Sequence, residues 1–314
     1  MTASAPNVPI DQCAARGDWK MTIACIVKVN DGFVLAADSA TTVSAHDGEG
    51  APQVVNIYNN ANKIFNLHKA LPIGAMTWGL GNVGPATIST LTKDLRLRFS
   101  GRDKSKGDWE LDPDGYTMAE VADRVKVFLY DEKYQATPPL ANGPNSWLGF
   151  LVGGYSAHAD QPEVFSFLFG QAGGDVPTPV LPDAAGTSWF GQPEAITRLV
   201  MGASTGLPAA LVNLGVEPGN ADQAVAAIHQ QLQASLVSDA MPIRDAIDFA
   251  EFLVDVTIKF VRFSPGHATV GGPIELASIT KHEGFKWIAR KHFYGAQPNP
   301  REDPPWTRST VDER

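Results

Sequence analysis

The sequence has few cysteines and no long apolar run. Its two cysteines, Cys13 and Cys25, form no CxxC pair and have no histidine cluster beside them. This argues against a disulfide framework and against a zinc site. No run of about 18 apolar residues occurs, so no segment has the composition of a membrane-spanning helix. We therefore expect no metal, no cofactor and no membrane partner.

Positive charge is also scarce. The 25 Lys and Arg residues against 34 Asp and Glu give a net charge of −9. Nucleic-acid binding needs a basic face, so this balance argues against a nucleic-acid partner. The first 20 residues lack the basic start and apolar stretch of a secretory signal. We expect a cytoplasmic protein.

Strand signals dominate the part of the chain that begins at Thr22. A β-branched apolar run over 22–29, the turn Asn30-Asp31-Gly32 and a second apolar run over 33–37 predict a β-hairpin. Further strands are predicted over 63–67, 73–78, 147–155, 163–169, 187–190, 273–280 and 285–289. Helices are predicted over 85–97, 117–134, 198–214, 221–237 and 243–263, and a loop over 44–53.

The order of these elements indicates the fold class. Hairpins come first, then helices, strands, helices and a closing hairpin, whereas alternating βαβ units would indicate a parallel sheet. We predict an α+β protein, a four-layer α/β/β/α sandwich of two antiparallel sheets. The predicted domain covers 22–296 with an insertion near 192–238, between a leader or propeptide at 1–21 and a mobile tail at 297–314.

Four residues carry a resemblance to a known family. Thr22, Gly32 and Asp38 begin, turn and close the first hairpin, and Lys63 heads a later strand. Thr22 and Asp38 are 38 − 22 = 16 positions apart. This pattern resembles the proteasome β-subunit family of N-terminal nucleophile (Ntn) hydrolases, most densely from Thr22 to about position 97. The stretch 172–240 does not align with that family.

The resemblance implies a threonine-type amide-bond (peptide) hydrolase. In it, Thr22 is the nucleophile, Lys63 supplies a positive charge, and Asp38 holds that ammonium in place. The backbone N–H groups of Trp78 and Gly79 would bind the oxyanion. Substrate preference would depend on Ser39, Thr41, Thr42 and Met76. The implied partners are a peptide or protein substrate, further copies in a homo-oligomer, and an ATP-driven partner.

The chemistry requires a free amine on Thr22. A hydroxyl is a poor nucleophile unless a base takes its proton, and an α-amine with a pKa near 8 can do so. Thr22 would become the first residue if translation began at Met21 and that residue were trimmed. It would also do so if residues 1–21 were removed as a propeptide.

Two departures from the family's pattern favour an alternative. The family has an Asp and a Ser before a Gly-Gly pair, but residues 265–272 contain no Asp, and Val270 stands near the expected Ser. The family's mid-chain Ser-Gly is matched only by Phe190-Gly191-Gln192. The alternative is a non-catalytic ring or scaffold subunit that keeps residues 1–21.

Two motifs suggest other enzymes. Residues 79–84 match GxGxxG, but no acidic strand end follows about 20 positions later, so a tight strand-to-helix turn explains the glycines better than a dinucleotide site. Residues 202–206 match GxSxG around Ser204, but the parallel strands that should precede a nucleophile elbow are missing. We expect a capped turn there.

Overall fold

The predicted N-terminal hairpin forms the centre of one sheet in the computed structural model, which describes residues 22–46, 52–105, 107–137, 147–182 and 184–291. Its strands are β1 (Ile23–Val29) and β2 (Gly32–Ala37), and every residue of both is buried. Gly32 begins β2 with φ +148°, and a Cβ there would lie 2.3 Å from the carbonyl oxygen of Ile279. The turn therefore requires glycine.

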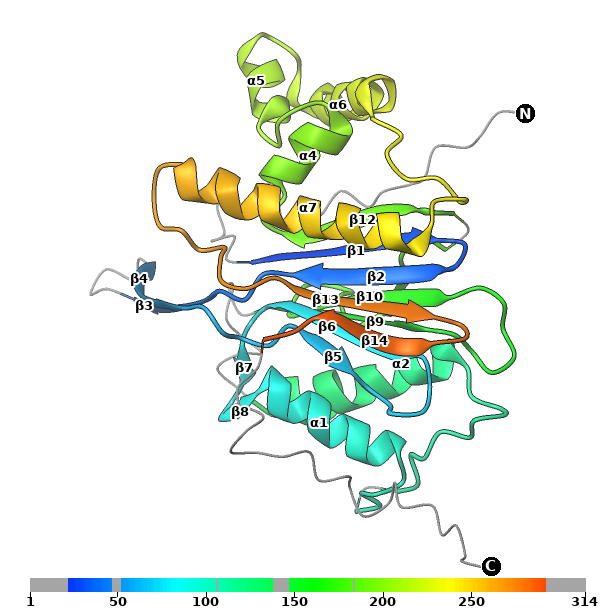
Figure 1. Cartoon of the computed structure of the whole chain (residues 1–314). Helices are drawn as coiled ribbons and strands as arrows, with labels where there is room; N and C mark the ends of the chain where they lie inside the picture. The colour runs from blue at the N-terminus through cyan, green and yellow to red at the C-terminus, as the bar shows by residue number, and fades with distance from the viewer. Residues whose placement is uncertain (1–21, 47–51, 106, 138–146, 183, 292–314) are drawn as a thin grey trace, which may run out of the picture.

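The first sheet has five antiparallel strands in the order β12-β1-β2-β13-β14 (Figure 1). Its other strands are β12 (Gly186–Gly191), β13 (Glu275–Thr280) and β14 (Gly284–Ala289). The last two are the predicted closing hairpin. Segments from the beginning, middle and end of the chain thus lie side by side in this sheet.

The second sheet also has five antiparallel strands, in the order β11-β10-β9-β6-β5. These strands are β5 (Ile64–Asn66), β6 (Ile73–Gly79), β9 (Leu148–Gly154), β10 (Glu163–Phe169) and β11 (Thr178–Pro179). An apolar cluster with members from both sheets, including Ile26, Leu35, Met76 and Leu151, lies between them.

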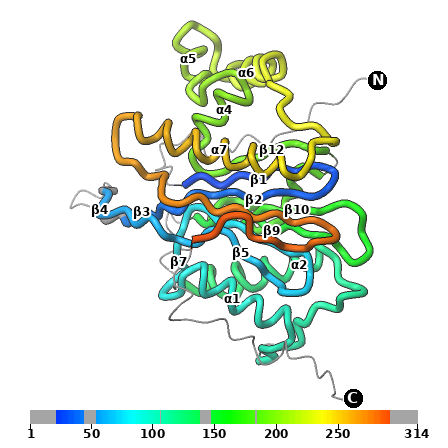
Figure 2. The backbone as a smooth tube through the Cα atoms, viewed as in Figure 1, coloured from blue at the N-terminus to red at the C-terminus, as the bar shows by residue number. Residues whose placement is uncertain are grey.

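Helices cover the outer side of each sheet (Figures 1 and 2). α7 (Ile243–Phe263) contacts β1 and β2 through its apolar face. α1 (Ile88–Phe99) and α2 (Met118–Lys126), which continues as the π-helix η2 (Val127–Tyr134), pack against the second sheet. The α+β class with antiparallel sheets is confirmed. No helix among these described segments is long and apolar enough to cross a bilayer.

Three shorter helices stand between β12 and α7 in the chain. They are α4 (Glu194–Met201), α5 (Leu207–Asn213) and α6 (Pro218–Leu232). Figure 1 shows them on the side of α7 that faces away from the sheets. The single helix predicted over 198–214 is divided here, because Gly202 ends α4 in the left-handed conformation with φ +75°.

Two further sequence expectations were wrong locally. The loop predicted over 44–53 includes the facing ends of the strand pair β3 (Thr41–His46) and β4 (Pro52–Tyr58), where small and polar residues give no strand signal. Residues 47–51 lie outside the described part. The helix predicted from position 85 begins at Ile88, because the short strands β7 (Asn82–Val83) and β8 (Ala86–Thr87) come first. The hydroxyl of Thr87 accepts a hydrogen bond from the Thr90 N–H and caps that helix. The predicted leader 1–21 and tail 297–314 also lie outside the described residues.

Candidate active site

The first hairpin brings Thr22 and Asp38 together. Thr22 precedes β1 and Asp38 follows β2, and the antiparallel register pairs Ala24 with Ala37. The Thr22 hydroxyl donates a hydrogen bond to Oδ1 of Asp38 at 2.8 Å. Thr22 is 5% exposed and Asp38 is fully buried. A local turn therefore positions both groups.

Lys63 reaches the same place from the second sheet, just before β5. Its ammonium donates to Oδ1 of Asp38 at 2.5 Å and also to the Thr22 hydroxyl. The Thr22 oxygen thus donates to a carboxylate while it accepts from an ammonium. The three side chains form a buried, hydrogen-bonded cluster where the two sheets meet.

Backbone amides complete the surroundings of the Asp38 carboxylate. Oδ1 accepts from the N–H of Ile23 at 3.0 Å, and Oδ2 accepts from the N–H groups of Ala40 at 3.1 Å and Gly271 at 3.0 Å. A buried carboxylate is costly without such donors. Gly271 belongs to the Gly-Gly pair whose preceding residues depart from the family's pattern, so this segment contacts the site through its backbone.

Burial lowers the pKa of the Lys63 ammonium, and the Asp38 and Glu275 carboxylates partly offset that effect. A desolvated lysine releases its proton more readily than an exposed one. The Lys63 ammonium thus donates to the Thr22 hydroxyl from a buried position, held there by the Asp38 carboxylate.

Two residues that sequence reasoning missed lie next to this cluster. Oε2 of Glu275 accepts from the backbone N–H of Lys63 at 3.2 Å and lies 3.4 Å from the Lys291 ammonium. Lys291 in turn donates to the hydroxyl of Ser39 at 2.6 Å. The sequence offers a signal for Glu275, because it is an acidic residue in an apolar strand. A glutamate is rarely buried without a partner. Lys291 has no comparable signal.

The segment Phe190-Gly191-Gln192 fixes the backbone of Thr22. Gly191 pairs with Ile23, and the N–H of Gln192 donates to the Thr22 carbonyl at 2.7 Å. Gly191 has φ +92°, and a Cβ there would lie 2.2 Å from that carbonyl oxygen. This close approach leaves no room for a side chain.

Trp78 and Gly79 end β6, the strand beside β5. The Thr77 N–H donates to the Lys63 carbonyl at 2.9 Å, which ties this strand end to the cluster. The Trp78 ring is buried and stacks on Phe190 with a centroid distance of 4.1 Å. Its indole nitrogen has no hydrogen-bond partner among the described residues. Gly79 has φ +81° and lies against Trp147.

The four predicted substrate-binding residues have different environments. Ser39 is buried, and its hydroxyl donates to the Pro273 carbonyl at 2.6 Å. Thr41 is partly exposed, whereas the hydroxyl oxygen of Thr42 is buried with no partner in the described part of the chain. Met76 is fully buried in the cluster between the sheets.

The GxSxG motif has a structural explanation. Oε1 of Glu194 accepts from the Ser204 hydroxyl at 2.7 Å, and Oε2 accepts from the Thr205 N–H at 2.9 Å. Burial opposes ionisation of Glu194, but the bonds from Ser204, Thr205 and Arg198 outweigh it and lower its pKa to about 2. The motif forms a turn bound to α4. In the described residues, no group of three or more His, Cys, Asp or Glu could hold a metal ion.

No family model matches the chain, and no curated protein matches it. Solved structures of Anbu, an ancestral beta-subunit, resemble its fold. The protein from Yersinia bercovieri is 11% identical with a TM-score of 0.46, covering 86% of this chain and 88% of its own. The Anbu (Gly-1) mutant from Hyphomicrobium sp. strain MC1 is 14% identical with a TM-score of 0.51, covering 86% of each chain.

These comparisons correct the family assignment made from the sequence. The predicted membership of the proteasome β-subunit family is wrong, since no family model matches and the structural likeness is to Anbu. At 14% identity, the likeness to the Hyphomicrobium structure concerns the fold alone. The fold resembles that of this Anbu structure, and any activity must be argued from the residues of this chain.

Proposed function

We propose that this protein is a threonine-type amide hydrolase whose nucleophile is the Thr22 hydroxyl. The observation that supports it best is the buried contact of that hydroxyl with Lys63 and Asp38. Buried ionisable groups around a hydroxyl mark a candidate nucleophile. The proposal includes a four-layer α/β/β/α arrangement, with a helical insertion near 192–238.

The reaction proceeds by acyl transfer. The Thr22 oxygen attacks the amide carbonyl carbon while its proton passes to a base, the free α-amine of Thr22 after processing. The amide C–N bond then breaks, the leaving amine takes the proton, and an ester remains on Thr22. Water attacks this ester, releases the acid and restores the hydroxyl.

The neighbouring residues have separate roles in this proposal. The positive charge of Lys63 favours loss of the hydroxyl proton, and Asp38 orients that ammonium. Backbone N–H groups at Trp78 and Gly79 bind the oxyanion. In this proposal Thr41 and Thr42 contact the substrate, whereas Ser39 and Met76, which are fully buried, affect substrate preference only through packing.

The proposal also requires processing. Residues 1–21 are removed so that Thr22 carries the free amine, and residues 22–296 form the mature domain. The substrate is a peptide or protein segment, and the mature chains assemble into homo-oligomers in the cytoplasm. Sedimentation of the processed protein measures that assembly.

Activity of three variants tests the proposal. Protein that begins at Thr22 is assayed with a panel of fluorogenic peptides, beside Thr22→Ala, Thr22→Ser and Thr257→Ala. Thr257 is a matched control, because it is fully buried in α7 and donates to the Leu253 carbonyl at 2.8 Å.

The expected result separates the nucleophile from other buried threonines. Thr22→Ala loses at least about a thousandfold in rate. Thr22→Ser keeps part of the rate, and Thr257→Ala keeps nearly all of it. Equal activity of Thr22→Ala and the wild type would contradict the proposal, as would no hydrolysis of any peptide by the processed wild type.

A further inference from the structure

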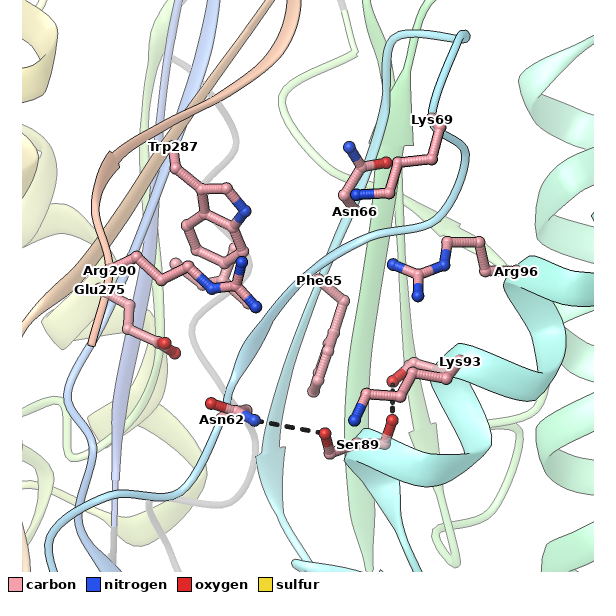
Figure 3. Close-up of a pocket in the computed structure, with 12 residues that line it drawn as sticks. Asn62, Phe65, Asn66, Lys69, Ser89, Lys93, Arg96, Glu275, Trp287 and Arg290 are labelled. Atoms are coloured by element: carbon pink, nitrogen blue, oxygen red, sulfur yellow. Dashed lines mark hydrogen bonds between the residues drawn. The ribbon is translucent and has the colours of Figure 1, made fainter. Parts of the chain in front are cut away.

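A cavity lies beside the candidate active site, between α1, β5 and the end of β14 (Figure 3). Its volume is about 180 Å³. The cavity is lined by Asn62 and Ile64, the two neighbours of Lys63 in the chain. The side chains of Thr22, Asp38 and Lys63 do not line it. The proposed reaction assigns no role to this cavity.

Four cationic side chains line the cavity. Lys93 and Arg96 come from α1, Lys69 from the loop after β5, and Arg290 from the residue after β14. Figure 3 shows them around a common space. None of the four forms a salt bridge with a described residue.

The one acidic residue among the described lining residues does not neutralise this charge. It is Glu275, whose Oε2 already contacts the backbone N–H of Lys63 and the ammonium of Lys291. Arg290 lies over the Trp287 ring, 4.8 Å from its centroid, and that contact carries no negative charge. The cavity therefore keeps an excess of positive charge in a chain whose net charge is −9.

The cations also affect one another. Burial lowers the pKa of Lys69, and the positive charges of Arg96 and Arg290 lower it further. The pKa of Arg96 is also lowered, first by burial and then by the positive charges of Arg290 and Arg102. Like charges that approach in a partly desolvated space destabilise the folded chain. A bound anion would remove this repulsion.

We propose that this cavity binds the phosphate group of a small ligand. Guanidinium groups match phosphate oxygens in pairs, and lysine ammonium groups add point charges, so two of each suit a multiply charged phosphate. The volume is below the roughly 300–1,000 Å³ of pockets that enclose drug-sized molecules. It suits an orthophosphate or pyrophosphate group, whether free or as part of a nucleotide whose base lies against Trp287.

Calorimetric titration with two probes tests this inference. Pyrophosphate and ADP are titrated separately into the full chain at about 150 mM NaCl, where surface charges are largely screened. The variants are Arg96→Gln, Arg290→Gln and Lys93→Gln. Lys286→Gln is the matched control, because Lys286 is exposed on β14 and lies outside the cavity.

We expect saturable binding of one anion per chain. Each cavity variant should weaken it at least tenfold, and Lys286→Gln less than twofold. If ADP binds tenfold more tightly than pyrophosphate, and this difference disappears in Trp287→Leu, the phosphate group belongs to a nucleotide. Equal affinities would identify the free anion. No saturable binding of either probe, or equal losses in Lys286→Gln and the cavity variants, would overturn the proposal.

Thermal unfolding gives a second measurement that does not depend on catalysis. A ligand that binds only the folded state raises the melting temperature as its concentration increases. Pyrophosphate should do so for the wild type but not for Arg96→Gln. Without ligand, Arg96→Gln should melt at or above the wild-type temperature, because a repelling charge has been removed. Anion stabilisation that persists in the cavity variants would contradict the assignment.

Discussion

Glu275 and Lys291 form a buried ion pair with 3.4 Å between Oε2 and Nζ, and their side chains are 1% and 5% exposed. The same Glu275 oxygen accepts the backbone N–H of Lys63. Burial lowers the pKa of Lys291, and Glu275 offsets part of that effect. This pair therefore links the last described residue of the chain to the candidate nucleophile cluster.

Breaking this pair should destabilise the protein. Lys291→Met leaves the Glu275 carboxylate buried without its ammonium, and we expect a loss of about 2 kcal/mol or more in the free energy of unfolding. The double variant Lys291→Met with Glu275→Leu should recover part of that loss, because no charge remains. Urea denaturation measures both. A single-variant change below about 0.5 kcal/mol would show that the pair contributes little.

Because of Lys63, the free energy of unfolding should change with pH in the range below the ordinary lysine pKa. Its folded-state pKa is lowered below the ordinary 10.5, so the unfolded chain binds more protons between the two values. The free energy of unfolding should therefore rise with pH through that window, relative to Lys63→Met, and the difference should be flat below it. Denaturant titrations at a series of pH values measure this. A difference that falls with rising pH would contradict the sign.

Glu194 should contribute stability that is lost in acid. Its pKa is lowered to about 2 from 4.5, so its contribution is present above pH 4.5 and disappears as pH falls to about 2. Glu194→Gln should unfold more easily than the wild type at pH 7 and equally near pH 2.

Ser204→Ala should keep full peptidase activity. Loss of activity in Ser204→Ala with intact folding would instead favour Ser204 as a nucleophile.

Gly191→Ala should disturb Thr22. The methyl group would meet the Thr22 carbonyl oxygen at 2.2 Å in a conformation with φ +92°. We expect a loss of about 1–3 kcal/mol from backbone strain, together with reduced hydrolysis. Gly219→Ala is the matched control, because a Cβ added at Gly219, in the first turn of α6, meets nothing within 4 Å. Similar effects of both changes would refute a specific role for Gly191.

Local sequence determined the parts of the site that could be predicted. Thr22 and Asp38 meet because apolar strands and a tight turn fix their register within 16 positions. Lys63 was identified only through a resemblance, since its contact crosses between sheets. Glu275 lies 212 positions from Lys63, and no spacing rule links residues so far apart. The fold class followed from element order, whereas the β3–β4 pair was missed because its facing ends are small and polar.

The intact mass and N-terminal sequence of the untagged protein from its native cell test the central claim most directly. A chain that begins at Thr22 is the predicted result, because only then does the nucleophile carry a free amine. A chain that retains residues 1–21 would contradict the mechanism. It would favour a non-catalytic scaffold with this fold.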